Sequence, residues 1–220
     1  MSHLRTFKAI SLAVLIFVGL GIQSRPIHAQ DSEVLTVAGG CFWCVESDFE
    51  RVKGVKEVVS GYTGGTVDNP TYKQVVRGNT GHYEAVQIIF DPAIVSRDQI
   101  LSMFFRSVDP TDPAGQFCDR GQSYATAIFP GDEAQAMAAK RAKADAEAAL
   151  GQRVVTPILE AGPFWAAEDY HQDYYKSDTL VLTRFGPKSK ASAYKAYRKA
   201  CGRDKRVRDL WGSAAPFTGS

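Results

Sequence analysis

The sequence lacks a charge excess, an internal repeat and a low-complexity linker. Its 220 residues include 26 Lys and Arg against 24 Asp and Glu, a formal net charge of +2. This balance does not favour nucleic acid as a partner, and the basic stretch at residues 188–208 is typical of a solvated tail. With 45% hydrophobic and 23% charged residues, the composition is that of an ordinary globular protein. We therefore predict one domain with one substantial core.

The apolar stretch near the N-terminus, residues 9–22, is short for a membrane span. Arg5 and Lys8 precede it, and the small residue Ala29 suits a cleavage position. These features predict a secretory signal peptide over residues 1–29, cleaved near Ala29, and a periplasmic or secreted protein without stable membrane association. An uncleaved N-terminal anchor is the alternative. In both cases the folded part lies outside the cytoplasm.

Cysteine is scarce, with four residues that all follow the predicted signal: Cys41, Cys44, Cys118 and Cys201. An oxidising compartment permits disulfides, and four cysteines allow three full pairings that the sequence alone does not distinguish. A zinc site is a poor fit, because Cys118 and Cys201 each lack the nearby Cys or His of a second half-site. We therefore expect no metal.

Among these cysteines, Cys41 has the most informative position, between a strand-like segment at residues 34–38 and a helix-like segment at residues 45–52. A thiol at the first turn of a helix lies near unpaired N–H groups and the positive end of the helix dipole. We therefore expect its pKa to be lowered and its thiolate fraction raised. Phe42 and Trp43 beside it would form an apolar pocket for a small uncharged group. Cys41 is thus a candidate nucleophile.

The rest of the chain alternates short strand-like and longer helix-like segments. Strands are predicted over residues 34–38, 55–60, 83–90, 124–129 and 154–160, and helices over residues 45–52, 96–106 and 132–150, with a short helix from Pro70. From Glu168 onward the chain is expected to turn helical and then polar. Because the order is not a strict βαβ repeat, we predict an α+β fold in which helices flank a mixed sheet.

Polar residues stand at the ends of several predicted elements, where sites are usually built. Glu84 begins an apolar strand, and a buried glutamate with a raised pKa can remain protonated and donate a proton. Tyr72 offers a phenol as hydrogen-bond donor. The run at residues 163–172 starts with aromatic residues and carries Glu168 and His171. The structural alternatives are a solvated strand end for Glu84, a tyrosine packed on the core for Tyr72, and an aromatic core stripe for residues 163–172.

The loop at residues 116–124 combines a thiol, a carboxylate and a phenol within seven residues: Cys118, Asp119 and Tyr124. So many polar and reactive side chains in so short a loop are hard to explain by packing. The structural alternative is a turn in which Asp119 caps the backbone.

Together these runs resemble the peptide methionine sulfoxide reductases of the A type, over nearly all of the chain after the signal. The matching runs follow the family's order: Gly40-Cys41-Phe42-Trp43, Gly61-Tyr62-Thr63-Gly64-Gly65, Asn69-Pro70-Thr71-Tyr72, Gly81-His82-Tyr83-Glu84 and Ala167-Glu168-Asp169-Tyr170-His171-Gln172. The resemblance implies thiol-dependent reduction of free and protein-bound methionine S-sulfoxide, a repair of oxidised proteins. It also implies a single domain over residues 30–220 with a ferredoxin-like (split β-α-β) core and an irregular, cysteine-bearing C-terminal tail.

The resemblance also assigns catalytic roles. Cys41 attacks the sulfoxide sulfur and becomes a sulfenic acid. Glu84, in its acid form, donates a proton to the oxygen, while Tyr72 and Tyr124 hydrogen-bond to it. Asp119 helps to organise the polar side of the site.

Substrate binding is assigned in the same way to Phe42, Trp43, Glu168 and His171, with the first two holding the methyl group. The resemblance implies no bound cofactor and a monomeric enzyme. A thioredoxin-like protein serves as reductant, which for an exported enzyme must act outside the cytoplasm.

A second thiol has to resolve oxidised Cys41, and here the sequence departs from the commonest family pattern, because Cys44 stands where glycine is frequent. Cys44 is close enough to Cys41 for a disulfide, whereas Cys201 lies in a tail that could swing in. Cys118 lies next to Asp119. We rank the resolving candidates as Cys201, then Cys44, then Cys118.

Two other functions remain open from the sequence. A thioredoxin-like thiol–disulfide oxidoreductase would use Cys41-x-x-Cys44 between a strand and a helix. That function leaves Glu84, Tyr72 and Asp119 without a role. A non-catalytic secreted domain with two structural disulfides is the second alternative.

Overall fold

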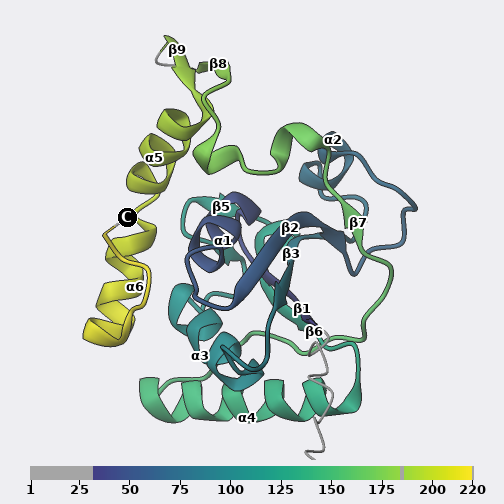
Figure 1. Cartoon of the computed structure of the whole chain (residues 1–220), viewed down its shortest axis with the longest axis vertical. Coiled ribbons are helices and arrows are strands. Elements are labelled where there is room, and N and C mark those ends of the chain that lie inside the picture. The colour runs from purple at the N-terminus through teal and green to yellow at the C-terminus, as the bar shows by residue number, and fades with distance from the viewer. Residues whose placement is uncertain (1–31, 184–185, 220) are drawn as a thin grey trace, which may run out of the picture.

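A five-stranded sheet forms the centre of the computed structural model, which describes residues 32–183 and 186–219 (Figure 1). The predicted signal peptide, residues 1–29 with its cleavage position near Ala29, lies outside the described residues. The strands, in sheet order, are β6 (Thr126–Phe129), β1 (Glu33–Gly39), β3 (Tyr83–Phe90), β2 (Val55–Thr63) and β7 (Trp165–Ala166). The strand β3 separates β1 from β2, so β1, α1 and β2 form the split β-α-β unit of a ferredoxin-like core.

The predicted α+β class and the central sheet with its flanking helices are confirmed, whereas the direction of the strands differs from the expected mixed sheet. All pairings between the five named strands are antiparallel. Residues 154–160, predicted as a strand, contribute one parallel bridge from Ile158 to Ile128. This segment contains Pro157, which has no N–H to donate to a ladder, so pairing does not extend along it.

The helices of the first two thirds are α1 (Phe42–Phe49), α2 (Tyr72–Val76), α3 (Arg97–Ser107) and α4 (Glu133–Leu150). Side-chain caps explain where α3 and α4 begin. Ser96 Oγ accepts a hydrogen bond from the N–H of Gln99, and Asp132 does so from the N–H of Gln135. These two helices lie close together at one end of the molecule (Figure 1). Among the described residues, no helix combines the length and apolarity needed to span a membrane.

The core lies between the sheet and the helices α1 and α3. Leu35 on β1 is opposite Ile88 on β3, Val37 is opposite Val86, and all four are buried. Phe104 of α3 belongs to the same apolar cluster. Full burial of such a side chain contributes about 1.5–3 kcal/mol to folding, so this cluster holds the strands that carry the site in fixed positions.

The segment from residue 180 onward is mostly regular, in contrast to the irregular tail that was expected. It contains β8 (Leu180–Thr183), β9 (Gly186–Ser189), α5 (Lys190–Ala200) and α6 (Arg203–Trp211), and the hairpin of β8 and β9 projects away from the sheet (Figure 1). Nor is the basic stretch wholly solvated, because Arg198 and Arg203 are buried. Arg198 pairs with Asp48 of α1, which explains why this segment packs against the body.

Shorter elements complete the chain. A two-stranded ribbon is formed by β4 (Gly115–Gln116) and β5 (Asp119–Arg120), and single 3-10 turns are found at η1 (Gln122–Tyr124), η2 (Asp169–His171), η3 (Tyr174–Lys176) and η4 (Gly212–Ala214).

Candidate active site

Cys41 stands at the point where β1 ends and α1 begins. Gly40 turns the chain with a φ of +82°, and a Cβ at that position would approach Gln116 Cβ to 2.6 Å, so glycine is required there. Cys41 is the N-cap residue of α1, and only 6% of its surface is exposed. The predicted strand-to-helix position of this thiol is therefore confirmed.

Burial, however, reverses the expected shift of its pKa. Desolvation raises the pKa of the Cys41 thiol well above its ordinary value, and Cys44, Glu84 and Asp119 act in the same direction. The lowered pKa expected from the helix start is wrong, because loss of solvent outweighs the helix dipole at this depth. By contrast, a hydrogen bond from Cys41 lowers the pKa of Cys44, and the charges of Arg203 and Arg198 also favour its thiolate.

Glu84 lies on β3, beside the beginning of α1. Its side chain is 1% exposed, and its Oε2 accepts a hydrogen bond of 3.1 Å from the backbone N–H of Phe42. Burial raises the pKa of Glu84 to about 8, even though the bond from Phe42 acts against the shift. The buried carboxyl group with a raised pKa, expected from the sequence, thus lies beside the start of the helix that follows Cys41.

Two tyrosines extend the polar side of the site. Tyr124 lies close enough to Glu84 and Tyr72 for its phenol to affect the pKa of both groups. Burial raises the pKa of both tyrosines, and the nearby Glu84 adds to the shift. Both phenols therefore keep their protons and can donate them in hydrogen bonds to an oxygen atom.

Asp119, on β5, faces the C-terminal segment. Its carboxylate accepts a hydrogen bond from the hydroxyl of Tyr197 on α5. Burial raises the pKa of Asp119, against the influence of Tyr197 and Arg203. In this arrangement α5 covers the site, since Cys41 also packs in one cluster with Tyr194 and Tyr197.

An aromatic cluster borders Cys41 on its helical side. The ring of Trp43 stacks on Tyr174 with centroids 3.8 Å apart, while His171 lies 5.2 Å from Phe42 and 4.4 Å from Tyr72. His171 is 3% exposed, and neither of its ring nitrogens has a hydrogen-bond partner. Burial lowers the pKa of His171 to about 4, so its ring is neutral and adds apolar surface near neutral pH.

Glu168 positions this cluster from the other side. Its Oε2 accepts a bond of 2.9 Å from the Tyr62 hydroxyl, and its Oε1 accepts one of 3.0 Å from the N–H of Tyr72. Burial acts to raise its pKa, but these bonds hold the pKa of Glu168 below its usual value. Sequence reasoning missed Tyr62 as a partner of this residue. The available signal was its place in the Gly61-Tyr62-Thr63 run at the end of β2.

The four cysteines fall into two pairs. Cys118 and Cys201 form a disulfide with their Cα atoms 5.0 Å apart, whereas Cys41 and Cys44 are free and buried. Cys44 is therefore the free thiol in contact with Cys41. The first and third resolving candidates, Cys201 and Cys118, are bonded to each other in this state.

An open cavity of about 520 Å³ lies beside the site. Its lining includes Trp43, Tyr174 and Tyr197 as well as both cysteines of the disulfide. Cys118 is exposed, so an external thiol can approach the Cys118–Cys201 bond from solvent.

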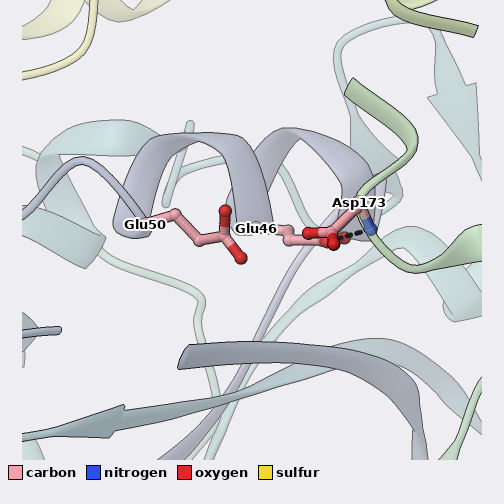
Figure 2. A group of neighbouring side chains, drawn as sticks. All are labelled: Glu46, Glu50 and Asp173. Atoms are coloured by element: carbon pink, nitrogen blue, oxygen red, sulfur yellow. Dashed lines mark hydrogen bonds between the residues drawn. The ribbon is translucent and has the colours of Figure 1, made fainter. Parts of the chain in front are cut away.

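Three carboxylates gather beside α1, and sequence reasoning did not single them out: Glu46, Glu50 and Asp173 (Figure 2). Glu46 accepts hydrogen bonds from Ser60 Oγ at 2.7 Å and from the N–H of Asp173 at 2.6 Å. Lys176 Nζ lies 2.9 Å from Glu50 and 2.7 Å from Asp173, so a side chain already supplies positive charge there. This group ties η3 to α1 and thereby places Tyr174 on Trp43.

Comparisons with known proteins agree on one family. The family model described as peptide methionine sulfoxide reductase matches residues 33–212. Peptide methionine sulfoxide reductase MsrA 2 of Rhizobium meliloti is 48% identical over 190 residues, covering 86% of this chain and 89% of that protein. Among solved structures, methionine sulfoxide reductase A of Corynebacterium diphtheriae matches with a TM-score of 0.60 and 33% identity, over 65% of this chain and 73% of that one. Reduced Mxr1 of Saccharomyces cerevisiae matches with a TM-score of 0.63 and 27% identity, over 66% of this chain and 84% of that one.

Proposed function

The chain belongs to the peptide methionine sulfoxide reductase family, and we propose that Cys41 and Glu84 are the residues with which it reduces methionine S-sulfoxide. One observation carries this assignment. The buried carboxyl group of Glu84 is hydrogen-bonded to the N–H of Phe42, the residue that follows Cys41, so an acid lies beside a thiol at the start of α1. Sulfoxide reduction needs both a nucleophile for sulfur and an acid for oxygen.

In the first step the sulfur of Cys41 attacks the sulfoxide sulfur while Glu84 protonates the sulfoxide oxygen, and the proton lost by the Cys41 thiol returns to the Glu84 carboxylate. The hydroxyl group then passes from the methionine sulfur to the Cys41 sulfur, so that the S–O bond to methionine and the transient S–S bond break as the S–O bond on Cys41 forms. The products are methionine and a sulfenic acid on Cys41, so the enzyme sulfur is oxidised as the substrate is reduced. The hydroxyl groups of Tyr72 and Tyr124 stabilise the developing charge on oxygen, and Asp119 orders this polar side.

The aromatic cluster supports the binding of the substrate's methyl group. Phe42, Trp43 and the neutral ring of His171 present apolar surface beside the thiol. Glu168 acts through its bonds to Tyr62 and to the backbone of Tyr72, and so it positions the phenol rather than contacting the sulfoxide.

In the second step Cys44 attacks the sulfenic sulfur of Cys41. A disulfide forms between them, and the oxygen leaves as water. We place Cys44 first in this role because it is the free thiol in contact with Cys41, whereas Cys201 and Cys118 are bonded to each other.

In the third step the Cys118 and Cys201 dithiol reduces the Cys41–Cys44 disulfide and becomes a disulfide itself. The described state, with the inner pair reduced and the outer pair oxidised, is the state expected after this exchange. A thioredoxin-like dithiol protein then reduces the outer disulfide, whose Cys118 is exposed.

We also propose that residues 1–29 are a signal peptide and that residues 30–220 form the exported reductase domain, in the periplasm or outside the cell. The basic residues before a short apolar stretch and the small residue Ala29 support this. The electron donor therefore acts outside the cytoplasm as well.

The proposed activity is tested by measuring turnover of the S and R forms of methionine sulfoxide, both free and in a peptide. Reduction of insulin disulfides is measured in parallel as the competing activity. Consumption of the S form with release of methionine is the expected result, and Cys41→Ser abolishes it. Multiple turnovers by Cys41→Ser would overturn the assignment of the nucleophile. Insulin reduction without sulfoxide turnover would instead favour a thiol–disulfide oxidoreductase.

A further inference from the structure

Arg203 is one of the largest fully buried side chains, with 2% of its surface exposed. It begins α6, and its guanidinium group reaches back into the body. Nη1 donates to the carbonyl of Gly39 at 3.2 Å, and Nη2 donates to the carbonyl of Ser107 at 2.9 Å. An arginine that ends between β1 and α3 lies directly behind the start of α1, where Cys41 and Cys44 are found.

The charge around this arginine is incompletely balanced. Asp48 is fully buried on α1, and its Oδ1 accepts a bond of 2.8 Å from Arg198, which also pairs with Asp204. Arg203 Nε lies 3.8 Å from Asp48 Oδ2, yet neither of these two atoms has a hydrogen-bond partner. One buried carboxylate thus faces two buried guanidinium groups, and Arg203 has the weaker contact. A buried charge with unsatisfied pairing strongly favours a further anion nearby.

Cys44 is placed to be that anion. It stands four residues before Asp48 on α1, and residues at this spacing lie on the same helix face. The groups that act on it electrostatically lie on several elements: Cys41 at the helix start, Asp48 on α1, Glu84 on β3, Tyr194, Tyr197 and Arg198 on α5, and Arg203 on α6. Tyr174 and Tyr175 of η3 pack against the same cluster. With Glu84 and the tyrosines protonated near neutral pH, Asp48 and the two arginines are the charged members of this set.

We propose that Arg203 is a positioning residue for the second step of the cycle: its buried, incompletely paired guanidinium stabilises negative charge on Cys44 and makes Cys44 the nucleophile toward oxidised Cys41. This inference rests on the proposed function. The Cys44 thiolate attacks the Cys41 sulfenic sulfur, the S–S bond forms and the S–O bond breaks. The leaving oxygen takes up the proton that Cys44 gave to solvent, together forming water. The hydrogen bond with Cys41 is the main cause of the lowered pKa of Cys44, and the charge of Arg203 acts in the same direction, which agrees with this role.

Arg203 is better suited to this role than Arg198. Arg198 has two carboxylate partners, whereas Arg203 has one distant partner. Arg203 also follows Cys201 by two residues, and its guanidinium stacks over Phe117, the neighbour of Cys118, at 4.9 Å. The same side chain therefore contacts the surroundings of both cysteine pairs.

A direct test uses the full chain with Cys41→Ser and the Cys118–Cys201 disulfide intact, which leaves Cys44 as the one titrating cysteine. The ultraviolet absorbance of its thiolate is followed against pH. The midpoint is expected below the ordinary cysteine value of about 8.5. Adding Arg203→Met is expected to raise the midpoint, whereas Arg208→Met, an exposed arginine on the same helix, leaves it unchanged. A midpoint at or above the ordinary value with Arg203 present would overturn the proposal.

Kinetics with the natural cysteines separates this proposal from the proposed function. After one equivalent of methionine sulfoxide, methionine release reports the first step, and loss of the second free thiol reports the second. Arg203→Met should retain methionine release but form the Cys41–Cys44 disulfide roughly tenfold more slowly at neutral pH, with recovery in alkali, because the thiolate is the attacking form. Arg203→Lys, which keeps the charge, should restore much of the rate at neutral pH.

Two outcomes contradict the role of Arg203: an unchanged second step in Arg203→Met, or a slow second step that alkali does not restore. Failure of the unsubstituted enzyme to release methionine would contradict the proposed function instead. If circular dichroism shows that Arg203→Met does not fold, the Cys44 titration with Arg203 present and the rate of Arg203→Lys decide the question.

Discussion

The backbone N–H of Phe42 donates a hydrogen bond of 3.1 Å to Glu84 Oε2, and this bond joins the helix that carries the thiol to the strand that carries the acid. The two residues meet because β1 and β3 are neighbours in the sheet and α1 starts directly after β1. The bond favours the ionised carboxylate, but burial outweighs it and keeps Glu84 protonated near neutral pH. A single contact therefore fixes the position of the acid relative to the start of the helix that carries the nucleophile.

Replacing this acid should slow the first step without removing the thiol. A general acid of this kind contributes about 10²–10⁴-fold to a rate, so we expect Glu84→Gln to lose that much in single-turnover release of methionine. Gln keeps an oxygen that accepts the bond from Phe42, and alkylation of Cys41 should continue. Glu57→Gln, an exposed position on β2, is the matched control. An undiminished first step in Glu84→Gln would exclude Glu84 as the acid.

The pH dependence of the first step follows from the same residue. Because the pKa of Glu84 is raised to about 8, its acid form is present below that pH and is lost above it. Methionine release in single turnovers should therefore fall as the pH rises through about 8, and Glu84→Gln should not show this fall. A rate that stays level through this range in the unsubstituted enzyme would contradict the assignment.

Stability should respond to the same titration. The pKa of Glu84 is about 8 in the folded protein, against about 4.3 in an unfolded chain. Between these values the folded state binds a proton that the unfolded state does not, so the free energy of unfolding decreases as the pH rises through this window. Urea unfolding at several pH values should show a smaller decrease for Glu84→Gln than for Glu57→Gln. Equal slopes for the two variants would mean that Glu84 does not carry the buried proton.

The proposed roles of Cys44 and Cys201 in regenerating the Cys41 thiol can be tested separately. We expect mass spectrometry after one turnover to find a Cys41–Cys44 disulfide when the outer pair has been substituted, because these thiols are in contact. Cys44→Ser should still release one methionine but leave Cys41 as a sulfenic acid for longer. Cys201→Ser should form the inner disulfide and then stall with a thioredoxin-like donor. A Cys41–Cys201 disulfide as the first product would restore the order ranked from the sequence.

Much of the fold could be predicted because local patterns agree with it. Ser96 and Asp132 mark helix starts, and the apolar run after Glu84 marks a buried strand, which also explains why its acid form could be expected. The direction of the strands could not be obtained in this way. Sheet order depends on which strands pair across the core, and no short run of sequence specifies that.

The parts of the site that differ from expectation depend on contacts between distant segments. The pKa of Cys41 rises because α5, which is distant in the sequence, helps to bury it. The disulfide joins Cys118 to Cys201 across 83 residues. Arg203 looked like part of a solvated basic run, yet it is buried because the carbonyls of Gly39 and Ser107 accept its hydrogen bonds. Local reasoning about charge and helix position does not include such partners.

Helix α5 covers Cys41 and should therefore limit its reactivity toward alkylating reagents. The Cys118–Cys201 disulfide and the bond from Tyr197 to Asp119 hold α5 where it covers Cys41, which is 6% exposed. Loss of the disulfide removes one of these two links, so Cys41 should react faster with iodoacetamide in Cys118→Ser than in the oxidised enzyme. The free energy of unfolding should also fall by about 2–4 kcal/mol, the usual contribution of a disulfide.

Both readouts can be checked together. Peptide mass spectrometry in a Cys44→Ser background assigns the alkylation to Cys41, and urea unfolding gives the stability. Tyr197→Phe removes the second link and should increase alkylation further when combined with Cys118→Ser. The exposed Tyr170, changed to Phe, serves as the matched control. If Cys118→Ser loses stability while Cys41 alkylation stays as slow as in the oxidised enzyme, the disulfide stabilises the fold without holding α5 over the thiol.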